Sequence, residues 1–303
     1  MNKLHKTILL FSVVLVSLSV AECAQPEVPN SVVTFSFDGL EPLEEGVYEG
    51  WAVIGDENIS TGTFNVTSND TSNDTSNDTS NVSEEFSFSV DQDLSSADMI
   101  MVTIEPANDT DAEPSGIVIL AGDVENETAE LEFPVNLSEA NGTYILATPT
   151  NGADTNENSG IWFLQLPEPP TAGLELPELP NGWVYEGWVV NQGLPITSGR
   201  FTAVDEADLF DGYSSVEPGP PFPGEDYLVN PPEGITFPID LADGESLAVI
   251  SVEPDMNGTD PTGPTPFQIK PLIGEIPSGA MDHVNYPMEL NLSSVPSGVA
   301  TIE

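Results

Sequence analysis

Side chains that commonly perform catalysis or bind transition metals are scarce in this sequence. Beyond residue 23 the chain contains a single histidine, His283, and no cysteine. A zinc site needs three or four nitrogen or sulfur ligands, and a Ser-His-Asp triad would depend on His283 within the loop-like stretch Met281–Tyr286. Nucleophile-elbow, phosphate-loop and Cys-x-x-Cys motifs are also absent. We therefore predict no enzymatic activity, no catalytic residue and no metal centre.

Carboxylates, in contrast, are abundant, with 51 Asp and Glu residues in the chain. Paired carboxylates carry out glycoside hydrolysis. A chain with so many acids always contains such pairs, so their presence is weak evidence, and a hydrolase ranks behind a binding or a structural role. Oxygen-rich loops also suit Ca²⁺, and three stretches could each bind a cation: Asp91–Asp98, Asn108–Glu113 and Asp123–Thr128. None matches an EF-hand pattern, and a solvated acidic loop is the simpler interpretation. We expect no cofactor, with weakly bound Ca²⁺ as the open alternative.

The charge balance excludes whole classes of partner. Only 4 Lys and Arg residues oppose the acids, and the formal net charge is -47 at pH 7. Such a chain cannot neutralise phosphates, so we predict no nucleic-acid binding, and electrostatic attachment to anionic lipid is equally disfavoured. Self-repulsion of this size is relieved when salt shortens the range of the charges. The composition therefore indicates a halophilic or salt-rich habitat.

The first residues are typical of a secretory signal peptide. Lys3 and Lys6 precede the apolar stretch Ile8–Val20, and small residues follow near the expected cleavage point. We assign residues 1–23 to this signal, and no later segment is apolar enough to span a bilayer. The mature protein is therefore expected outside the cell or at its surface. Cys23 is either a lipid-bearing cysteine or an idle one, and the preceding Glu22 disfavours the lipid anchor.

Twelve Asn-x-Ser/Thr sequons make the exported chain a predicted glycoprotein. Most of them fall in the first half of the chain. The candidate glycosylation sites are Asn58, Asn65, Asn69, Asn73, Asn77, Asn81, Asn108, Asn126, Asn136, Asn141, Asn257 and Asn291.

The hexapeptide YEGWAV at Tyr48–Val53 returns as YEGWVV at Tyr185–Val190. The surrounding sequence repeats as well, from the approach to each hexapeptide as far as a Glu-Pro pair and a Pro-x-Gly turn. A weaker match joins Asn136–Thr148 to Asn291–Glu303. The repeated unit has the size of a domain. We therefore predict an internal duplication with one domain at residues 30–156 and a second at residues 157–303.

Each unit is predicted to consist of strands. Glu85–Val90 and Thr128–Phe133 alternate apolar and polar residues, whereas Met99–Ile104 and Leu247–Pro254 are apolar on both faces, as buried strands are. Turn-forming Pro and Gly separate these runs. The expected fold is all-β, with two tandem antiparallel β-sandwich domains.

Within the repeated hexapeptides, four aromatic residues are predicted to be structural core residues: Tyr48, Trp51, Tyr185 and Trp188. Glu186 shares the face of Trp188, which is unusual for a carboxylate. It either lies at a solvated strand end or pairs across the hairpin with Arg200, and both interpretations are open.

The segments after the first hairpin differ most between the copies. In the first copy, the loop at residues 65–84 is rich in Thr, Ser, Asn and Asp and carries five consecutive sequons, so we expect a solvated, glycosylated loop. In the second copy, the loop at residues 202–234 is rich in proline and aromatic residues. Long loops of this kind are often functional. We predict that it binds a ligand, with contacts from Phe210, Tyr213, Phe222, Asp226 and Tyr227.

The motifs resemble the extracytoplasmic C-terminal domain of anti-sigma-K factors. A Leu-Pro-x-Leu-Pro-x-Gly approach leads into Tyr-x-x-Trp-Val-Val, followed by Gly-x-Phe, Val-Glu-Pro and a Pro-x-Gly turn. Here the second copy has LPELPNGWVYEGWVV, ISVEP and PTG, and the first has VYEGWAV, STGTF, VTIEP and EPSG. The resemblance implies an outward-facing sensor-type domain in two tandem copies, without the sigma-binding domain or the transmembrane helix of that family.

These observations predict an exported, acidic, non-enzymatic sensor or binding module at the cell surface. Its partner would be a surface protein or a small ligand. The alternative is a structural glycoprotein of the cell envelope, stabilised by divalent cations and salt.

Overall fold

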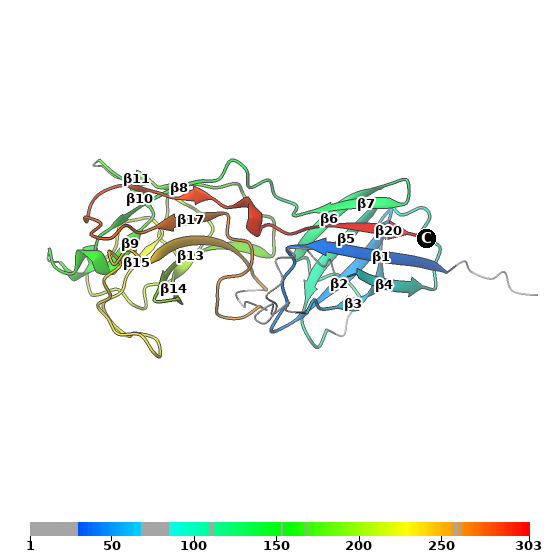
Figure 1. The fold of residues 1–303 in the computed structure, drawn as a ribbon, viewed down its shortest axis with the longest axis horizontal. Coiled ribbons are helices and arrows are strands. Elements are labelled where there is room, and N and C mark those ends of the chain that lie inside the picture. The colour runs from blue at the N-terminus through cyan, green and yellow to red at the C-terminus, as the bar shows by residue number, and fades with distance from the viewer. Residues whose placement is uncertain are drawn as a thin grey trace, which may run out of the picture.

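The computed structural model describes residues 30–67, 85–109, 112–152, 154–167, 169–256, 258, 260 and 262–303. The signal segment, Cys23 and five of the sequons (Asn69, Asn73, Asn77, Asn81 and Asn257) lie outside this part of the chain. The described chain is all-β, and every strand pairing is antiparallel (Figure 1). No helix in it has the length and hydropathy needed to cross a membrane.

The strands gather in two lobes that lie side by side along the long axis of the molecule (Figure 1). The first lobe is one sheet of eight strands in the order β3-β2-β5-β6-β7-β20-β1-β4. These strands are β1 (Ser31–Asp38), β2 (Val47–Ile54), β3 (Glu57–Phe64), β4 (Glu85–Val90), β5 (Met99–Glu105), β6 (Val118–Glu125), β7 (Thr128–Glu132) and β20 (Ser297–Ile302).

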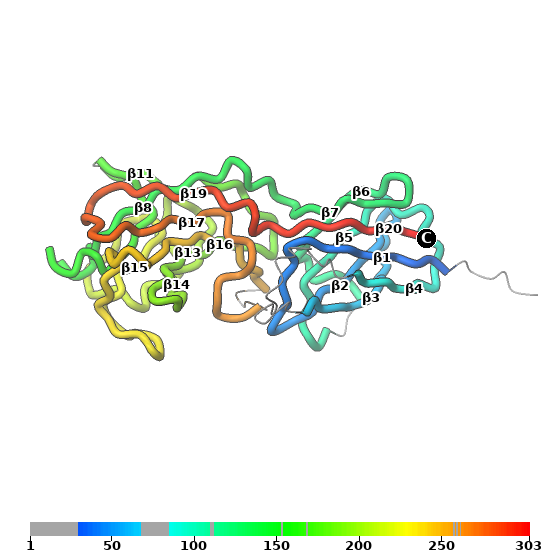
Figure 2. Tube along the Cα trace, in the orientation of Figure 1, coloured from blue at the N-terminus to red at the C-terminus, as the bar shows by residue number. Residues whose placement is uncertain are grey.

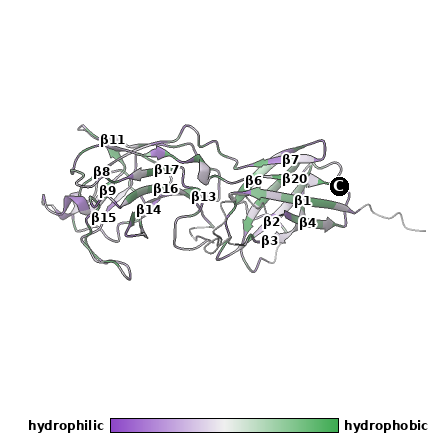
Figure 3. Cartoon of the chain, viewed as in Figure 1, coloured by the Kyte–Doolittle hydropathy of each residue, from purple (hydrophilic) through white to green (hydrophobic). Residues whose placement is uncertain are grey.

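An aromatic core closes the first sheet on itself. The two ends of the strand order, β3 and β4, lie in contact, and the rings of Phe64 and Phe86 are 4.7 Å apart there. Alternate residues of β1 point the same way, so Phe35 and Phe37 enter the interior and stack on one another. The alternation predicted for Glu85–Val90 is therefore real, because its phenylalanines pack inward. Figure 3 shows hydrophobic residues along stretches of the strands.

The second lobe repeats this strand order in two adjoining sheets, β14-β13-β16-β17-β19 and β12-β8-β9-β15, with β18 on β8. Two short strands, β10 and β11, form a separate ribbon. The strands are β8 (Asn141–Leu146), β9 (Gly160–Trp162), β10 (Leu164–Gln165), β11 (Thr171–Ala172), β12 (Leu174–Glu175), β13 (Trp183–Asn191), β14 (Leu194–Phe201), β15 (Gly224–Asp226), β16 (Leu247–Pro254), β17 (Leu272–Glu275), β18 (Tyr286–Pro287) and β19 (Glu289–Leu290). Single 3-10 turns occur at Pro149–Asn151, Glu157–Ser159 and Leu292–Ser294.

One strand of each copy lies in the lobe of the other copy. Strand β20 inserts between β7 and β1 of the first lobe, and β8, the corresponding strand of the first copy, pairs with β9, β12 and β18 of the second lobe. The sheets therefore do not separate at the expected boundary between residues 156 and 157. The reason is that the weakly matching segments Asn136–Thr148 and Asn291–Glu303 each complete the sheet of the other copy.

Two chain segments, between β7 and β8 and between β19 and β20, join the lobes within the described chain (Figure 2). Trp183 of the second lobe packs edge-on against Phe133, with ring centroids 5.3 Å apart. Its indole nitrogen donates to the Val118 carbonyl oxygen at 3.2 Å. A mixed apolar and polar contact therefore holds the lobes together next to the two connecting segments.

Candidate binding surface

The repeated Tyr-Glu-Gly-Trp sequence forms the same structural device in both lobes. Its tyrosine points inward and its hydroxyl donates to a backbone carbonyl oxygen, Glu41 for Tyr48 at 2.7 Å and Pro177 for Tyr185 at 2.8 Å. Its glycine lies beneath a phenylalanine ring, Phe35 in the first lobe and Phe163 in the second. A side chain at either glycine would collide with that ring, so close packing against the phenylalanine requires glycine at this position of the motif.

The tryptophan of each copy begins a buried polar relay on the opposite face of the strand. Trp51 is 1% exposed, and its indole nitrogen donates to Thr103 Oγ1 at 2.8 Å. The Thr103 hydroxyl donates in turn to the Glu105 carboxylate. In the second lobe, Trp188 and Ser251 make the equivalent contact at 2.8 Å, and Ser251 donates to Glu253. The Glu of each Glu-Pro pair is thus an internal acceptor, and the four aromatic residues predicted as core are buried.

Of the two interpretations of Glu186, the structure shows the cross-strand pair with Arg200. Arg200 Nε lies 2.9 Å from Glu186 Oε2, in the register that places the two residues opposite one another. Arg200 also reaches Asp260 at 2.6 Å. In the first lobe, Glu49 faces Thr63 and accepts a hydrogen bond from Ser60 instead.

Buried carboxylates organise the long loop of the second lobe. In the first lobe Val33 of β1 faces Phe88 of β4, whereas at the corresponding place in the second lobe Ile161 faces Glu225. Glu225 is fully buried and accepts hydrogen bonds from the Ser214 hydroxyl and from the Tyr213 backbone N–H at 3.3 Å. A carboxylate thus stands where the first copy has an aromatic ring.

Two further carboxylates fasten the same loop. Asp208 accepts from the backbone N–H groups of Phe210 and Gly224, each at 2.8 Å. Asp226 accepts from the backbone N–H of Thr150 at 2.8 Å and from the Trp162 indole at 2.9 Å. These contacts tie the start of the loop to β15 and tie β15 to Thr150 and Trp162, so the loop has a defined conformation around them.

Burial raises the pKa of the carboxyl groups that hold this loop. It raises the pKa of Asp208 to about 6 and that of Glu225 to about 7, although the hydrogen bonds they accept act in the opposite direction. Burial also raises the pKa of Asp226. Asp208 and Glu225 therefore gain and lose protons closer to neutral pH than solvated carboxylates do.

The structure divides the five predicted contact residues. Asp226 and Tyr227 are 0% exposed, and Phe222 is 7% exposed. Tyr213 is half-buried and packs on Phe237 and Tyr227. Phe210 is half-buried as well, and its ring meets Tyr213 edge-on at 4.9 Å. Asp226 and Tyr227 thus lie in the interior, whereas the half-buried Phe210 and the largely buried Phe222 line a hollow.

The two most exposed large apolar residues of the described chain lie on this loop. Leu209 is 80% exposed and Val216 is 89% exposed. Both line a hollow of about 620 Å³ that also contacts Trp162, Phe210 and Phe222. On the other side of Leu209 and Phe210 lies a second hollow, of about 390 Å³, lined by Arg200 and Val184.

We define the loop surface as the residues around these two hollows: Trp162, Arg200, Asp208, Leu209, Phe210, Asp211, Val216, Glu217 and Phe222. Its exposed apolar residues stand among the carboxylates of Asp211 and Glu217. Sequence reasoning located the loop by its aromatic residues and missed Leu209 and Val216. A Leu and a Val carry no signal in a loop, because their exposure depends on how the loop folds back.

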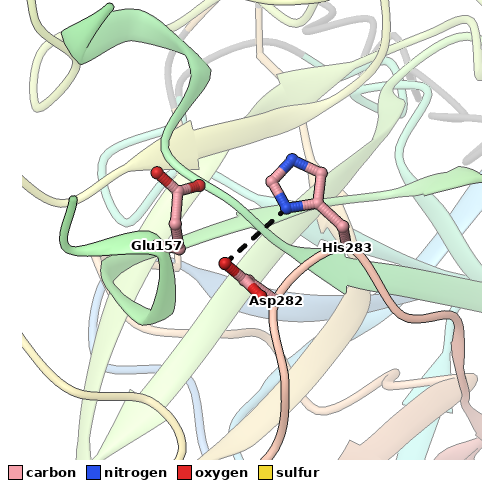
Figure 4. Close-up of side chains that lie close together, drawn as sticks. All are labelled: Glu157, Asp282 and His283. Atoms are coloured by element: carbon pink, nitrogen blue, oxygen red, sulfur yellow. Dashed lines mark ion pairs between the residues drawn. The ribbon is translucent and has the colours of Figure 1, made fainter. Parts of the chain in front are cut away.

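Metal-binding side chains come together at one place on the second lobe. Glu157, Asp282 and His283 offer ligand atoms that lie within 4.8 Å of one another, and Figure 4 shows them converging. His283 Nδ1 is 3.8 Å from Asp282 Oδ2. The Glu157 carboxylate already accepts from the Thr148 backbone N–H at 3.0 Å and from its hydroxyl at 3.2 Å. The cluster offers one nitrogen and two oxygen donors in an exposed setting.

Zinc is expected to bind this cluster only weakly, with a Kd on the order of 1 mM, which corresponds to a binding free energy of about -4 kcal/mol. The reason is that two of the ligands are exposed and the third, Glu157, already accepts hydrogen bonds from Thr148. The imidazole proton resonances of His283, followed by NMR during a Zn²⁺ titration, measure the affinity. Asp282→Asn should weaken the response further, and Asp240→Asn, a neighbouring acidic residue outside the cluster, should leave it unchanged. Micromolar binding, or equal binding by Asp282→Asn, would contradict the expectation.

Seven of the sequon asparagines lie in the described chain, and they differ in availability. Asn65 accepts from the Leu43 backbone N–H at 3.0 Å and donates to the Leu43 carbonyl oxygen at 2.9 Å. The amide of Asn291 donates to the Lys270 carbonyl oxygen at 3.0 Å. Both side chains therefore stabilise loops, whereas Asn126 and Asn141 are exposed.

Comparisons with protein-family models, with curated proteins and with solved structures found no similar protein.

Proposed function

We propose that the protein is an exported, non-enzymatic binding module of the cell surface, and that it binds its partner with the loop surface of the second lobe. The two lobes would be duplicated β-sandwich domains, of which the second has acquired the binding loop. The resemblance to the outward-facing domain of anti-sigma-K factors and the signal-like first residues support this location and role.

The exposure of Leu209 and Val216 carries the proposal. Large apolar side chains left in water on a fastened loop, next to a hollow of about 620 Å³, are typical of an interaction site. Hydrogen bonds donated to the carboxylates of Asp208, Glu225 and Asp226 hold the loop in place, so little conformational entropy is lost when a partner binds.

Charge defines the chemistry of the partner. Asp211 and Glu217 stand beside the apolar residues, and the whole chain carries a net charge of -47. A partner that covers Leu209 and Val216 must approach this negative field. We therefore propose a partner with apolar and cationic groups together, such as a basic segment of a surface protein.

A synthetic peptide of alternating lysine and leucine is a suitable probe for the proposal. We expect the protein to bind it, with NMR shifts concentrated at the loop surface and with weaker binding at high salt. Leu209→Ser together with Val216→Ser should weaken the binding at least tenfold, since burial of one such side chain contributes about 1.5–3 kcal/mol.

The matched control is Met281→Ser, which removes another exposed apolar side chain of the second lobe away from the loop surface. It should bind the peptide as the unchanged protein does. If the double variant and the control bound equally well, or if the shifts spread evenly over the acidic surface, the loop surface would not be the binding site.

A further inference from the structure

Strand β20 is an internal strand of the first-lobe sheet, where it lies between β7 and β1. It pairs with β1 over Val33↔Ile302 to Asp38↔Ser297, and with β7 over Thr128↔Thr301 to Glu132↔Ser297. The backbone of Val32 also exchanges two hydrogen bonds with Glu303, at 2.8 and 2.9 Å. Without β20 the facing edges of β1 and β7 would both lack their partners, so the lobe depends on receiving this strand.

The position of β20 in the first lobe suits that strand and not its counterpart β8. Ala300 of β20 is 0% exposed between Phe35 and Ala129, its directly paired neighbours. The residue at the matching position of β8 is Tyr144, which pairs with Tyr286 and stacks on its ring at 5.6 Å. A tyrosine has no room where Ala300 lies. Side-chain size thus assigns β20 to a first lobe, whichever copy of the chain that lobe belongs to.

The segments that carry the strands between the lobes border a surface hollow. Residues 133–138 lead to β8 and residues 292–296 lead to β20, and together they line a hollow of about 670 Å³. The lobes also touch at Trp183 with Phe133 and Val118, and where the Glu41 backbone N–H donates to the Gln268 side chain. A change in the path of the second segment would break its own contacts, such as the hydrogen bond between the Lys270 backbone N–H and Ser294, while all pairings of β20 could form again in a second copy.

From this arrangement we propose that the first lobe also accepts β20 from a second copy of the chain, so that two copies exchange β20 and form a dimer. Each lobe keeps the strand pairings that it has in the monomer. Only the connection from β19 to β20 then runs to a different molecule. The duplicated halves already exchange equivalent strands within one chain. Exchange between two chains would form the same strand pairings, with β20 supplied by the other chain.

Protein concentration decides between the two arrangements. Within one chain, the short connection gives β20 a high effective concentration at its own first lobe, in the millimolar range for short linkers. Folding in dilute solution should therefore give the monomer. Folding at protein concentrations that approach this range should give a growing fraction of exchanged dimer.

A disulfide across the β1–β20 pair reports which molecule donates the strand. Thr34 and Thr301 are direct partners, and antiparallel partners lie within the distance that a disulfide spans. In a Cys23→Ser background, Thr34→Cys with Thr301→Cys should be refolded from denaturant at a series of concentrations under reducing conditions, and then oxidised. Non-reducing electrophoresis should show intrachain-linked monomer after dilute refolding and interchain-linked dimer that increases with concentration.

The control pair Glu49→Cys with Thr63→Cys joins β2 and β3, which face one another within a hairpin. It should give intrachain disulfides at every concentration. Dimer in the control to the same extent as in the β1–β20 pair would indicate random cross-linking and overturn the proposal. Intrachain linkage of the β1–β20 pair at all concentrations would overturn it as well.

Discussion

Replacement of Gly187 by alanine is expected to lower the free energy of unfolding by about 1–3 kcal/mol, the usual cost of overpacking a core. A Cβ at this position would lie 2.7 Å from Phe163 Cε2 and would also press on the Ser198 hydroxyl. Both neighbours lie in packed surroundings, so the strain cannot be relieved by a move toward solvent. Urea denaturation followed by tryptophan fluorescence measures the change.

A double-mutant cycle isolates the collision from other effects of the alanine. Phe163→Leu leaves space above the glycine, so Gly187→Ala should cost markedly less in that background. In the first lobe, Gly50 has the same environment, with a Cβ contact of 2.6 Å to Phe35 Cζ. Gly50→Ala should therefore show a comparable loss, and a change below about 0.5 kcal/mol at both glycines would be inconsistent with the packing argument.

Stability is expected to fall as the pH rises from about 5 to about 9, by a few kcal/mol in total. Burial raises the pKa of Glu253 to about 8, of Glu225 to about 7 and of Asp208 to about 6. Between the ordinary value of each group and its raised value, the folded protein binds more protons than the unfolded chain. The stabilisation is thus fully present below the ordinary carboxyl pKa and is lost as the pH rises through 6 to 8.

Glu253→Gln tests the largest of these contributions. Glutamine can still accept hydrogen bonds from Ser251 and from the Phe267 backbone N–H, which lies 2.9 Å from the native carboxylate. Because the amide does not titrate, thermal unfolding of the variant should depend less on pH than that of the unchanged protein. Glu245→Gln, at an exposed position, is the control. A variant with an unchanged pH dependence would show that Glu253 titrates normally.

Local sequence pattern predicted the strands well because hydrophobic alternation determines which face of a strand is buried. Glu85–Val90 and Leu247–Pro254 are strands with the predicted bounds. Hairpin register offered the pair of Glu186 with Arg200 as one of two interpretations, and the structure shows that pair. Strand exchange was beyond such reasoning, since β8 and β20 each have a plausible partner in their own copy. The choice depends on the size of Tyr144 and Ala300 against neighbours far away in the sequence.

Sequence reasoning could not separate the exposed residues of the candidate loop from its buried ones. The aromatic residues that drew attention to the loop include Tyr227, which is fully buried. Aromatic rings in a long loop can fill a core of their own, and pattern does not distinguish that role from binding. The burial of Glu225 could not be predicted either, because nothing in the sequence distinguishes it from the other residues among the 51 acids.

The exchange of strands also sets an order of assembly during synthesis. The second lobe is continuous in the chain from β8 to β19, so it can fold as soon as that stretch has been made. The first lobe begins with β1 but must wait for β20, which follows the whole second lobe. Assembly therefore runs opposite to the usual order, in which the N-terminal domain folds first. Until β20 arrives, β1 and β7 expose unpaired edges, which are sites where other chains can pair and aggregate.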